Sequence, residues 1–176
     1  QPEQVVEILN EYLEAMTQCI FKWHGTLDKY VGDEIMAIWG APLSVNEPEK
    51  LALKCCWEQL QILETLRQKW KEEGRDVIDI GMGLNTGDMI VGNIGSSVHK
   101  DYTVIGDAVN LAARLEAATR DFSEGDDICH LIISHDTYQE VKDICKVKAL
   151  GDIQVKGKKD YVKVYRVLDV DIERSA

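Results

Sequence analysis

Residues 25–42 read G-T-L-D-K-Y-V-G-D-E-I-M-A-I-W-G-A-P. Two short β-prone runs, 26–31 and 34–39, flank the pair Gly32-Asp33. A two-residue connection that begins with glycine is typical of a tight hairpin turn. The stretch therefore predicts a β-hairpin, with the carboxylate of Asp33 exposed at its tip.

Patterns typical of helices flank this hairpin on both sides. Upstream, apolar residues recur at spacings of three and four, which predicts an amphipathic helix with a buried face formed by Val6, Leu9, Leu13, Met16 and Ile20. Downstream, residues 47–73 carry a longer apolar stripe that runs from Leu53 to Trp70. The rest of the chain predicts strands at 77–86, 89–94, 102–105, 131–134, 147–155 and 162–168, and helices at 108–119 and 136–141. This interleaving indicates an α/β or α+β fold with one sheet.

Composition narrows the class of protein. The chain has 176 residues, 45% hydrophobic and 29% charged, which is typical of one globular domain spanning residues 1–176. Its net charge of −11 disfavours a nucleic-acid partner, which normally calls for a basic face. No apolar run approaches the roughly 20 residues that span a bilayer, so we expect no membrane segment within this chain. The five cysteines include no C-x-x-C pair, which argues against a disulfide framework or a cysteine zinc site and favours the cytoplasm.

The hairpin tip offers the first candidate for chemistry. A rigidly held, exposed carboxylate such as that of Asp33 suits Mg²⁺, which takes one or two carboxylates together with water and phosphate oxygens. Ordinary turn chemistry also explains a Gly-Asp pair, and the pair alone favours that simpler interpretation. If the ligand is a nucleotide, the acidic chain needs a divalent metal and a few well-placed cationic side chains to hold its phosphates.

Two further groups have the chemistry to bind phosphate. Asn110 and Arg114 lie four residues apart on a predicted helix and therefore share one face. An amide and a guanidinium on one face suit a phosphoryl group and the charge that develops on it. Lys156 lies in a Lys/Gly cluster between two predicted strands, where it suits phosphate contacts. Taken alone, both groups are more often solvated surface features.

Three segments together resemble one known family. They are residues 25–42, the stretch I-G-M-G-L-N-T-G-D-M-I-V-G-N-I-G-S at 80–96, and the stretch D-Y-T-V-I-G-D-A-V-N-L-A-A-R-L-E at 101–116. Their content, order and spacing resemble those of the class III adenylyl and guanylyl cyclases. The resemblance covers nearly the whole chain. It implies a ferredoxin-like core with one mostly antiparallel sheet and flanking helices, and a head-to-tail homodimer with its active sites at the interface.

The resemblance also implies a role for each candidate residue. Lys29 and Thr103 match the two base-recognising positions, where guanylyl cyclases typically carry Glu and Cys. The implied substrate is therefore ATP, converted to 3′,5′-cyclic AMP and pyrophosphate. Asp33 matches the second of two metal-binding aspartates, which share two Mg²⁺ or Mn²⁺ ions. The remaining matches are the pair that orients the ribose and stabilises the transition state, Asn110 and Arg114, and the phosphate-binding Lys156.

One departure from the family pattern bears on activity. The first metal-binding aspartate belongs to an F-x-D-I-x-G-F-T type segment that should precede Gln1. We therefore expect an N-terminally truncated catalytic domain that is nearly inactive when expressed as residues 1–176. Two alternatives stay open: a guanylyl cyclase, which Lys29 and Thr103 disfavour, and a silent homology domain that only dimerises or regulates.

Overall fold

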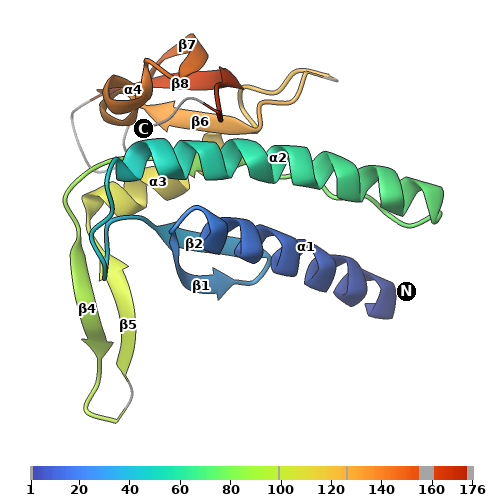
Figure 1. Cartoon of the computed structure of the whole chain (residues 1–176), viewed down its shortest axis with the longest axis horizontal. Coiled ribbons are helices and arrows are strands. Elements are labelled where there is room, and N and C mark those ends of the chain that lie inside the picture. Colours follow the sequence, from blue (N-terminus) through green and yellow to red (C-terminus); the bar gives the residue numbers. More distant parts are fainter. Residues whose placement is uncertain (1, 99, 126, 155–160, 174–176) are drawn as a thin grey trace. The chain divides into compact units, whose positions relative to one another are not determined.

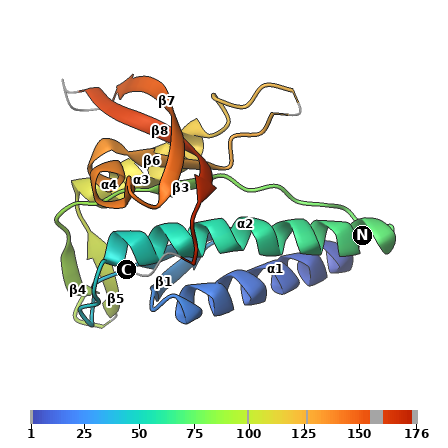
Figure 2. The same cartoon turned by 45° about the horizontal axis from the view of Figure 1, so that its top comes forward.

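The computed structural model describes residues 2–98, 100–125, 127–154 and 161–173. The chain divides into two compact units, residues 1–80 and residues 81–176. The first contains two long helices and a β-hairpin: α1 (Pro2–Lys22), β1 (Thr26–Val31), β2 (Glu34–Ile38) and α2 (Pro48–Glu72). Both views of the chain show α1 and α2 lying side by side (Figures 1 and 2).

The hairpin forms as the sequence predicts. β1 and β2 pair antiparallel from Thr26 opposite Ile38 to Val31 opposite Glu34. Gly32 takes a left-handed φ of 66°, which glycine adopts at little cost and which a hairpin turn of this kind needs at its first central position. Asp33 follows it at the exposed tip.

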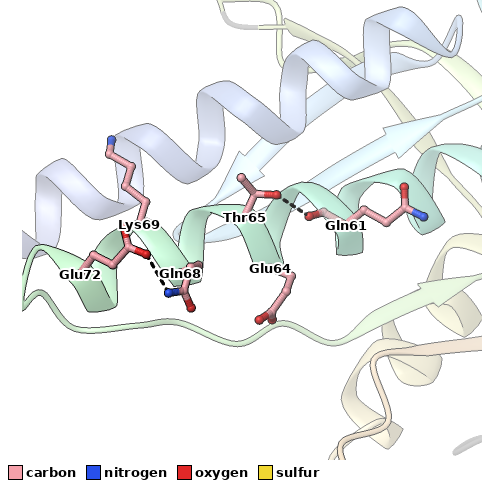
Figure 3. Close-up of a pocket in the computed structure, with 6 residues that line it drawn as sticks. All are labelled: Gln61, Glu64, Thr65, Gln68, Lys69 and Glu72. Carbon is pink, nitrogen blue, oxygen red and sulfur yellow. Dashed lines mark hydrogen bonds between the residues drawn. The ribbon is translucent and has the colours of Figure 1, made fainter.

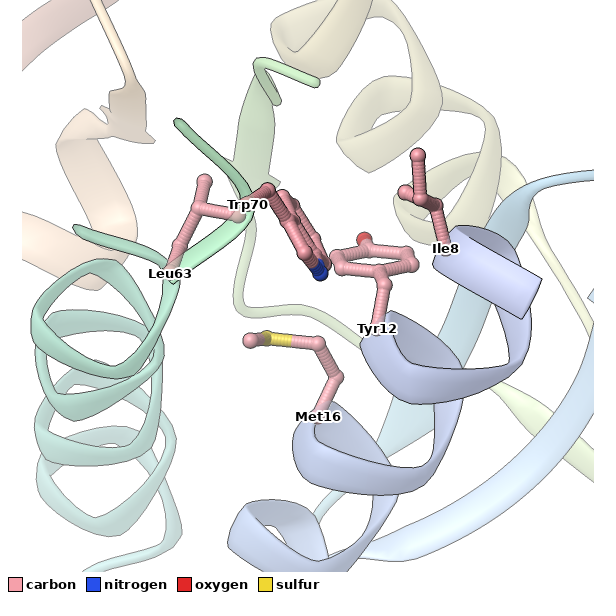
Figure 4. Packing of buried hydrophobic residues seen from close by; sticks show 5 residues of the cluster. All are labelled: Ile8, Tyr12, Met16, Leu63 and Trp70. Carbon is pink, nitrogen blue, oxygen red and sulfur yellow. The ribbon is translucent and has the colours of Figure 1, made fainter. Parts of the chain in front are cut away.

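The core of the N-terminal unit forms where α1 packs against α2. Ile8, Tyr12 and Met16 of α1 form one buried cluster with Leu63 and Trp70 of α2 (Figure 4). Met16 and Trp70 are almost completely buried, and such large side chains typically stabilise a fold by about 1.5–3 kcal/mol each through burial.

The predicted buried face of the first helix is partly wrong. Val6 is 55% exposed, whereas Ile8 and Tyr12 are buried. The helix carries two overlapping apolar stripes, because Ile8, Tyr12 and Met16 also recur at a spacing of four. The stripe that becomes buried is the one that meets Trp70, a partner far away in the sequence.

A network of ion pairs and hydrogen bonds around Glu11 joins α1 to the end of α2. One Glu11 carboxylate oxygen accepts from Lys69 Nζ at 2.8 Å and from Trp70 Nε1 at 3.1 Å. The other accepts from Arg75 Nη1 at 2.8 Å. These donors lower the pKa of Glu11 to about 2, so the carboxylate stays charged throughout the range in which carboxyl groups usually titrate.

The described part of the C-terminal unit forms a four-stranded sheet, a β-hairpin and two helices. Its elements are β3 (Met82–Leu84), β4 (Ile90–Gly95), β5 (Lys100–Ile105), α3 (Asp107–Ala118), β6 (Leu131–Ser134), α4 (His135–Val141), β7 (Cys145–Gln154) and β8 (Tyr161–Val170). The sheet has the order β3-β6-β8-β7, with one parallel pair, β3 and β6, and two antiparallel pairs. Both α3 and α4 contact this sheet, and β6 is buried along its whole length.

The α+β class is confirmed, but the described strands form three hydrogen-bonded sheets where one was expected. Among the described strands, β4 and β5 pair only with each other, and their hairpin extends away from the four-stranded sheet (Figure 1). The strand predicted at 77–86 shrinks to Met82–Leu84. Its partner β6 has only four residues, so the parallel ladder ends after three pairs.

Candidate active site

The hairpin tip holds the predicted metal ligand. Asp33 is exposed beside Gly32. Its negative charge also acts on Tyr12 in the core. Burial, together with the nearby Asp33 carboxylate, raises the pKa of Tyr12 to about 12 and keeps that phenol neutral. Within the described ranges, no three His, Cys, Asp or Glu side chains gather into a metal-binding group. The exposed carboxylate of Asp33 suits an ion whose other ligands include phosphate oxygens and water.

Lys29 lies on β1 of the same hairpin. Its side chain is 40% exposed, and its Nζ lies 3.6 Å from Oδ2 of Asp28. The pairing of β1 with β2 shifts by one residue between Leu27 and Lys29, so Asp28 is the extra residue of a β-bulge. The predicted base-reading ammonium is thus adjacent to a carboxylate that the motif contains but that the sequence analysis did not single out.

The helix α3 carries Asn110 and Arg114 on one face. Asn110 is exposed and Arg114 is half-buried, while Leu115 anchors the opposite side of the helix with no exposed surface. The prediction that the amide and the guanidinium share a helical face is confirmed. Such a pair can orient a hydroxyl group and neutralise a phosphoryl oxygen.

Glycines in the second motif allow α3 to lie against β3. A Cβ atom on Gly83 would collide with backbone atoms of Ala112 and Glu116, and one on Gly81 would collide with the Thr119 hydroxyl. Neither Gly81 nor Gly83 was among the candidate residues predicted from the sequence. The alternation of glycine along a short apolar strand was the signal for a closely packed helix.

The start of α3 is held by a neighbouring amide. Asn85 Nδ2 donates to the carbonyl oxygen of Ala108 at 2.9 Å. A Cβ on Gly87 would come within 2.8 Å of the Ala108 methyl group, so the loop after β3 also fits closely around this turn. The second motif therefore positions the third, and Asn85 is a positioning residue that the sequence analysis missed.

Thr103 lies on β5, directly opposite Gly92 of β4. Opposite residues of an antiparallel pair point to the same face, and a Cβ on Gly92 would meet nothing within 4 Å. Glycine therefore leaves open space beside Thr103, whose own side chain is largely buried. A small hollow lies at the base of this hairpin, lined by Asp88, Met89, Ile90, Ile105 and Gly106.

The candidate residues divide between the units. Lys29 and Asp33 belong to the N-terminal unit, and Thr103, Asn110 and Arg114 belong to the C-terminal unit. Lys156 lies outside the described residues.

A shallow hollow on α2 is unrelated to these motifs. It is lined by Gln61, Glu64, Thr65, Gln68, Lys69 and Glu72 (Figure 3). Gln68 Nε2 donates to Glu72 at 2.8 Å and Lys69 pairs with Glu11, so these polar groups bond within the unit. This arrangement is typical of a solvated helix face. None of the described helices combines the length and the apolar character that crossing a membrane requires.

Two solved structures that are similar to this chain are cyclases. The adenylyl cyclase CyaB from P. aeruginosa is 36% identical with a TM-score of 0.89, over 99% of this chain and 87% of that one. The guanylyl cyclase Cya2 is 34% identical with a TM-score of 0.86, over 97% of this chain and 83% of that one. These likenesses confirm the expected class III cyclase fold.

Two curated relatives are also cyclases, and both are longer than this chain. Adenylate cyclase 1 of Rhizobium meliloti is 28% identical over 169 residues, which cover 96% of this chain and 25% of that protein. The adenylate cyclase of Anabaena cylindrica is 26% identical over 178 residues, covering 95% of this chain and 33% of that protein. The chain thus spans a quarter to a third of the length of these two relatives. The adenylate and guanylate cyclase catalytic domain family matches residues 1–169, and the chain belongs to that family.

Proposed function

We propose that the two units together form the catalytic domain of an adenylate cyclase, which converts ATP to 3′,5′-cyclic AMP and pyrophosphate. The observation that carries this proposal is the pair Lys29 and Thr103 at the base-reading positions. An ammonium or a hydroxyl can donate to N1 of adenine, and the hydroxyl can instead accept from the 6-amino group. Guanine presents a protonated N1 instead, so the same pair disfavours GTP.

The reaction is attack of the ribose 3′-hydroxyl on the α-phosphorus, with pyrophosphate as the leaving group. Such a reaction depends on positioning and charge neutralisation. In this proposal Asn110 holds the ribose, and the guanidinium of Arg114 stabilises charge on the α-phosphoryl oxygens. Lys156 binds the terminal phosphates.

The site calls for divalent metal, which cyclases of this family generally use. Asp33 would be one of the carboxylate ligands of two Mg²⁺ or Mn²⁺ ions, because its exposed carboxylate is of the kind these ions bind alongside phosphate oxygens. Bound ions of this kind make a hydroxyl more acidic and neutralise phosphate charge. The chain's net charge of −11 makes such counter-charge necessary for binding a nucleotide.

The active sites are proposed to be shared within a homodimer in the cytoplasm. Each site takes its metal carboxylates, Asp33 among them, from one subunit. Lys29, Thr103, Asn110 and Arg114 come from the other. A two-fold dimer then carries two equivalent sites.

The test is product identification with the full-length protein, ATP, and either Mg²⁺ or Mn²⁺. Cyclic AMP and pyrophosphate are expected in equal amounts. Asn110→Ala and Arg114→Ala should each lower the rate by about 100-fold or more, since each removes a transition-state contact, without a matching loss of thermal stability. Cyclic GMP formed from GTP alone would instead identify the guanylyl cyclase, and no product from either nucleotide would identify a silent homology domain.

A further inference from the structure

The bulge in β1 changes the direction of two neighbouring side chains. In a regular strand, successive side chains point to opposite faces, so residues 28 and 29 would diverge. The register of β1 on β2 shifts between Leu27 and Lys29, which leaves Asp28 opposite no residue of β2. A bulge of this kind breaks the alternation and redirects a side chain. The Asp28 carboxylate and the Lys29 ammonium consequently lie 3.6 Å apart.

Burial is distributed unequally between these two side chains. The side chain of Asp28 is 2% exposed, whereas that of Lys29 is 40% exposed. For comparison, Glu58 in its pair with Lys22 is 21% exposed. A side chain as buried as Asp28 has few rotamers available, because its neighbours pack around it. The carboxylate is therefore the fixed member of the pair, and the ammonium is the member that can reach a ligand.

The ion pair leaves Lys29 able to bind something else. An ammonium has three donors, and a contact with one carboxylate oxygen at 3.6 Å is longer than a close hydrogen bond. A flexible lysine side chain loses conformational freedom when it binds, and a neighbour that already restricts it lowers that cost. Burying a carboxylate costs solvation free energy that an ion pair recovers only with close geometry, and this pair is 3.6 Å apart, so stability alone is a weak reason for this arrangement.

We propose that Asp28 is a positioning residue for base selection, which holds the Lys29 ammonium in the orientation that reads adenine. This inference rests on the proposed function, since it takes Lys29 as the base reader. Asp28 itself touches no substrate. Its effect on nucleotide choice passes entirely through Lys29.

The test is a double-mutant cycle in the full-length protein with Asp28→Asn, Lys29→Met and the double variant. Asp28→Asn keeps the size of the side chain and removes its charge. It should raise KM for ATP and lower the ATP-over-GTP ratio of kcat/KM by about tenfold, with a smaller change in kcat. In the Lys29→Met background, Asp28→Asn should change that ratio by less than about twofold, because the residue it acts through is absent. Asp28→Glu, which keeps the negative charge, should retain part of the wild-type ATP-over-GTP ratio.

A matched control separates positioning from stability. Asp79, directly before the second motif, pairs with Arg67 at 3.3 Å in the same unit and is not one of the candidate site residues. Asp79→Asn should leave the ATP-over-GTP ratio unchanged even if the melting temperature falls. If Asp28→Asn lowers turnover of both nucleotides equally, or changes their ratio as much without Lys29 as with it, Asp28 is structural and the inference is overturned.

Nucleotide binding keeps this test separate from the proposed activity. Analogues that lack the attacking hydroxyl, 3′-deoxy-ATP and 3′-deoxy-GTP, bind without reacting, and the same variants can be compared by calorimetry. If the wild-type protein makes no cyclic AMP, the proposed function fails. The non-additive loss of preference for 3′-deoxy-ATP would still support Asp28. A wild type that binds neither analogue, or both equally, overturns the roles of Lys29 and Asp28 together.

Discussion

Gly83 lies so close to Ala112 that a single added methyl group would collide with the backbone of α3. This contact sets how closely the helix that carries Asn110 and Arg114 approaches β3. Gly83→Ala should therefore push α3 outward and destabilise the protein by about 1–3 kcal/mol, a typical cost of overpacking. The melting temperature should fall by roughly 2–4 °C per kcal/mol.

The activity of this variant should fall more than its stability. A shift of α3 displaces both Asn110 and Arg114, so kcat is expected to drop at temperatures where the variant is still folded. The matched control for stability is Gly92→Ala, since a Cβ there meets open space. Melting curves of both variants and initial rates of Gly83→Ala give the comparison, and equal stability of the two proteins would contradict the packing described for α3.

The Glu11 network predicts a pH-dependent contribution to stability. Hydrogen bonds from Lys69, Arg75 and Trp70 lower the pKa of Glu11 from 4.5 to about 2 in the folded protein. A carboxyl group with a lowered pKa stabilises the folded state above its unfolded pKa, and this stabilisation is lost as the pH falls from about 5 toward 2. Glu11→Gln should cost about 1 kcal/mol at neutral pH, after allowing for solvent screening at this partly exposed group.

Urea unfolding at a series of pH values measures this effect. The difference in unfolding free energy between the wild type and Glu11→Gln should be constant above about pH 5 and should shrink at lower pH. A difference that stays the same down to pH 2.5 would show that the charge of Glu11 does not stabilise the contact between α1 and α2.

Shared active sites predict that two dead variants rescue each other. Asp33→Ala and Arg114→Ala should each inactivate both sites of a homodimer. Mixing the two proteins forms heterodimers in about half of the dimers, each with one intact site of two, so activity should recover to about a quarter of the wild type. An assay of cyclic AMP formation after subunit exchange measures this recovery.

A second mixture controls for non-specific recovery. Asn110→Ala and Arg114→Ala affect residues that are proposed to come from the same subunit, so their heterodimer has no intact site. This mixture should stay inactive. Recovery in both mixtures, or in neither while tagged subunits are shown to exchange, would contradict the proposed sharing.

The parts of the fold that depend on local sequence were predictable. The hairpin matches its prediction to within one residue, because the Gly32-Asp33 turn carries its own conformational requirement. The strand at Leu131–Ser134 also matches. The limits of β3 were not predictable, because they depend on the short length of β6, and no pattern within residues 77–86 reports it.

The candidate site was likewise predictable only where it depends on local sequence. Motif content singled out Asp33, Asn110 and Arg114 as candidates, and the shared helical face of the last two follows from their spacing. The contact between Asp28 and Lys29 was not predictable, because alternation along a strand places neighbours on opposite faces. The bulge that brings them together depends on how β1 pairs with β2.

Substrate choice tests the account most directly. The full-length protein is given equal concentrations of ATP and GTP with Mn²⁺, and the cyclic products are separated and quantified at early times. Cyclic AMP should exceed cyclic GMP by at least about tenfold. Lys29→Glu with Thr103→Cys should lower that ratio by at least roughly tenfold, because mispaired polar groups at a binding site cost about 1–3 kcal/mol each. A wild type that makes mainly cyclic GMP, or a double variant that keeps the wild-type ratio, would contradict the assignment of these residues as adenine readers.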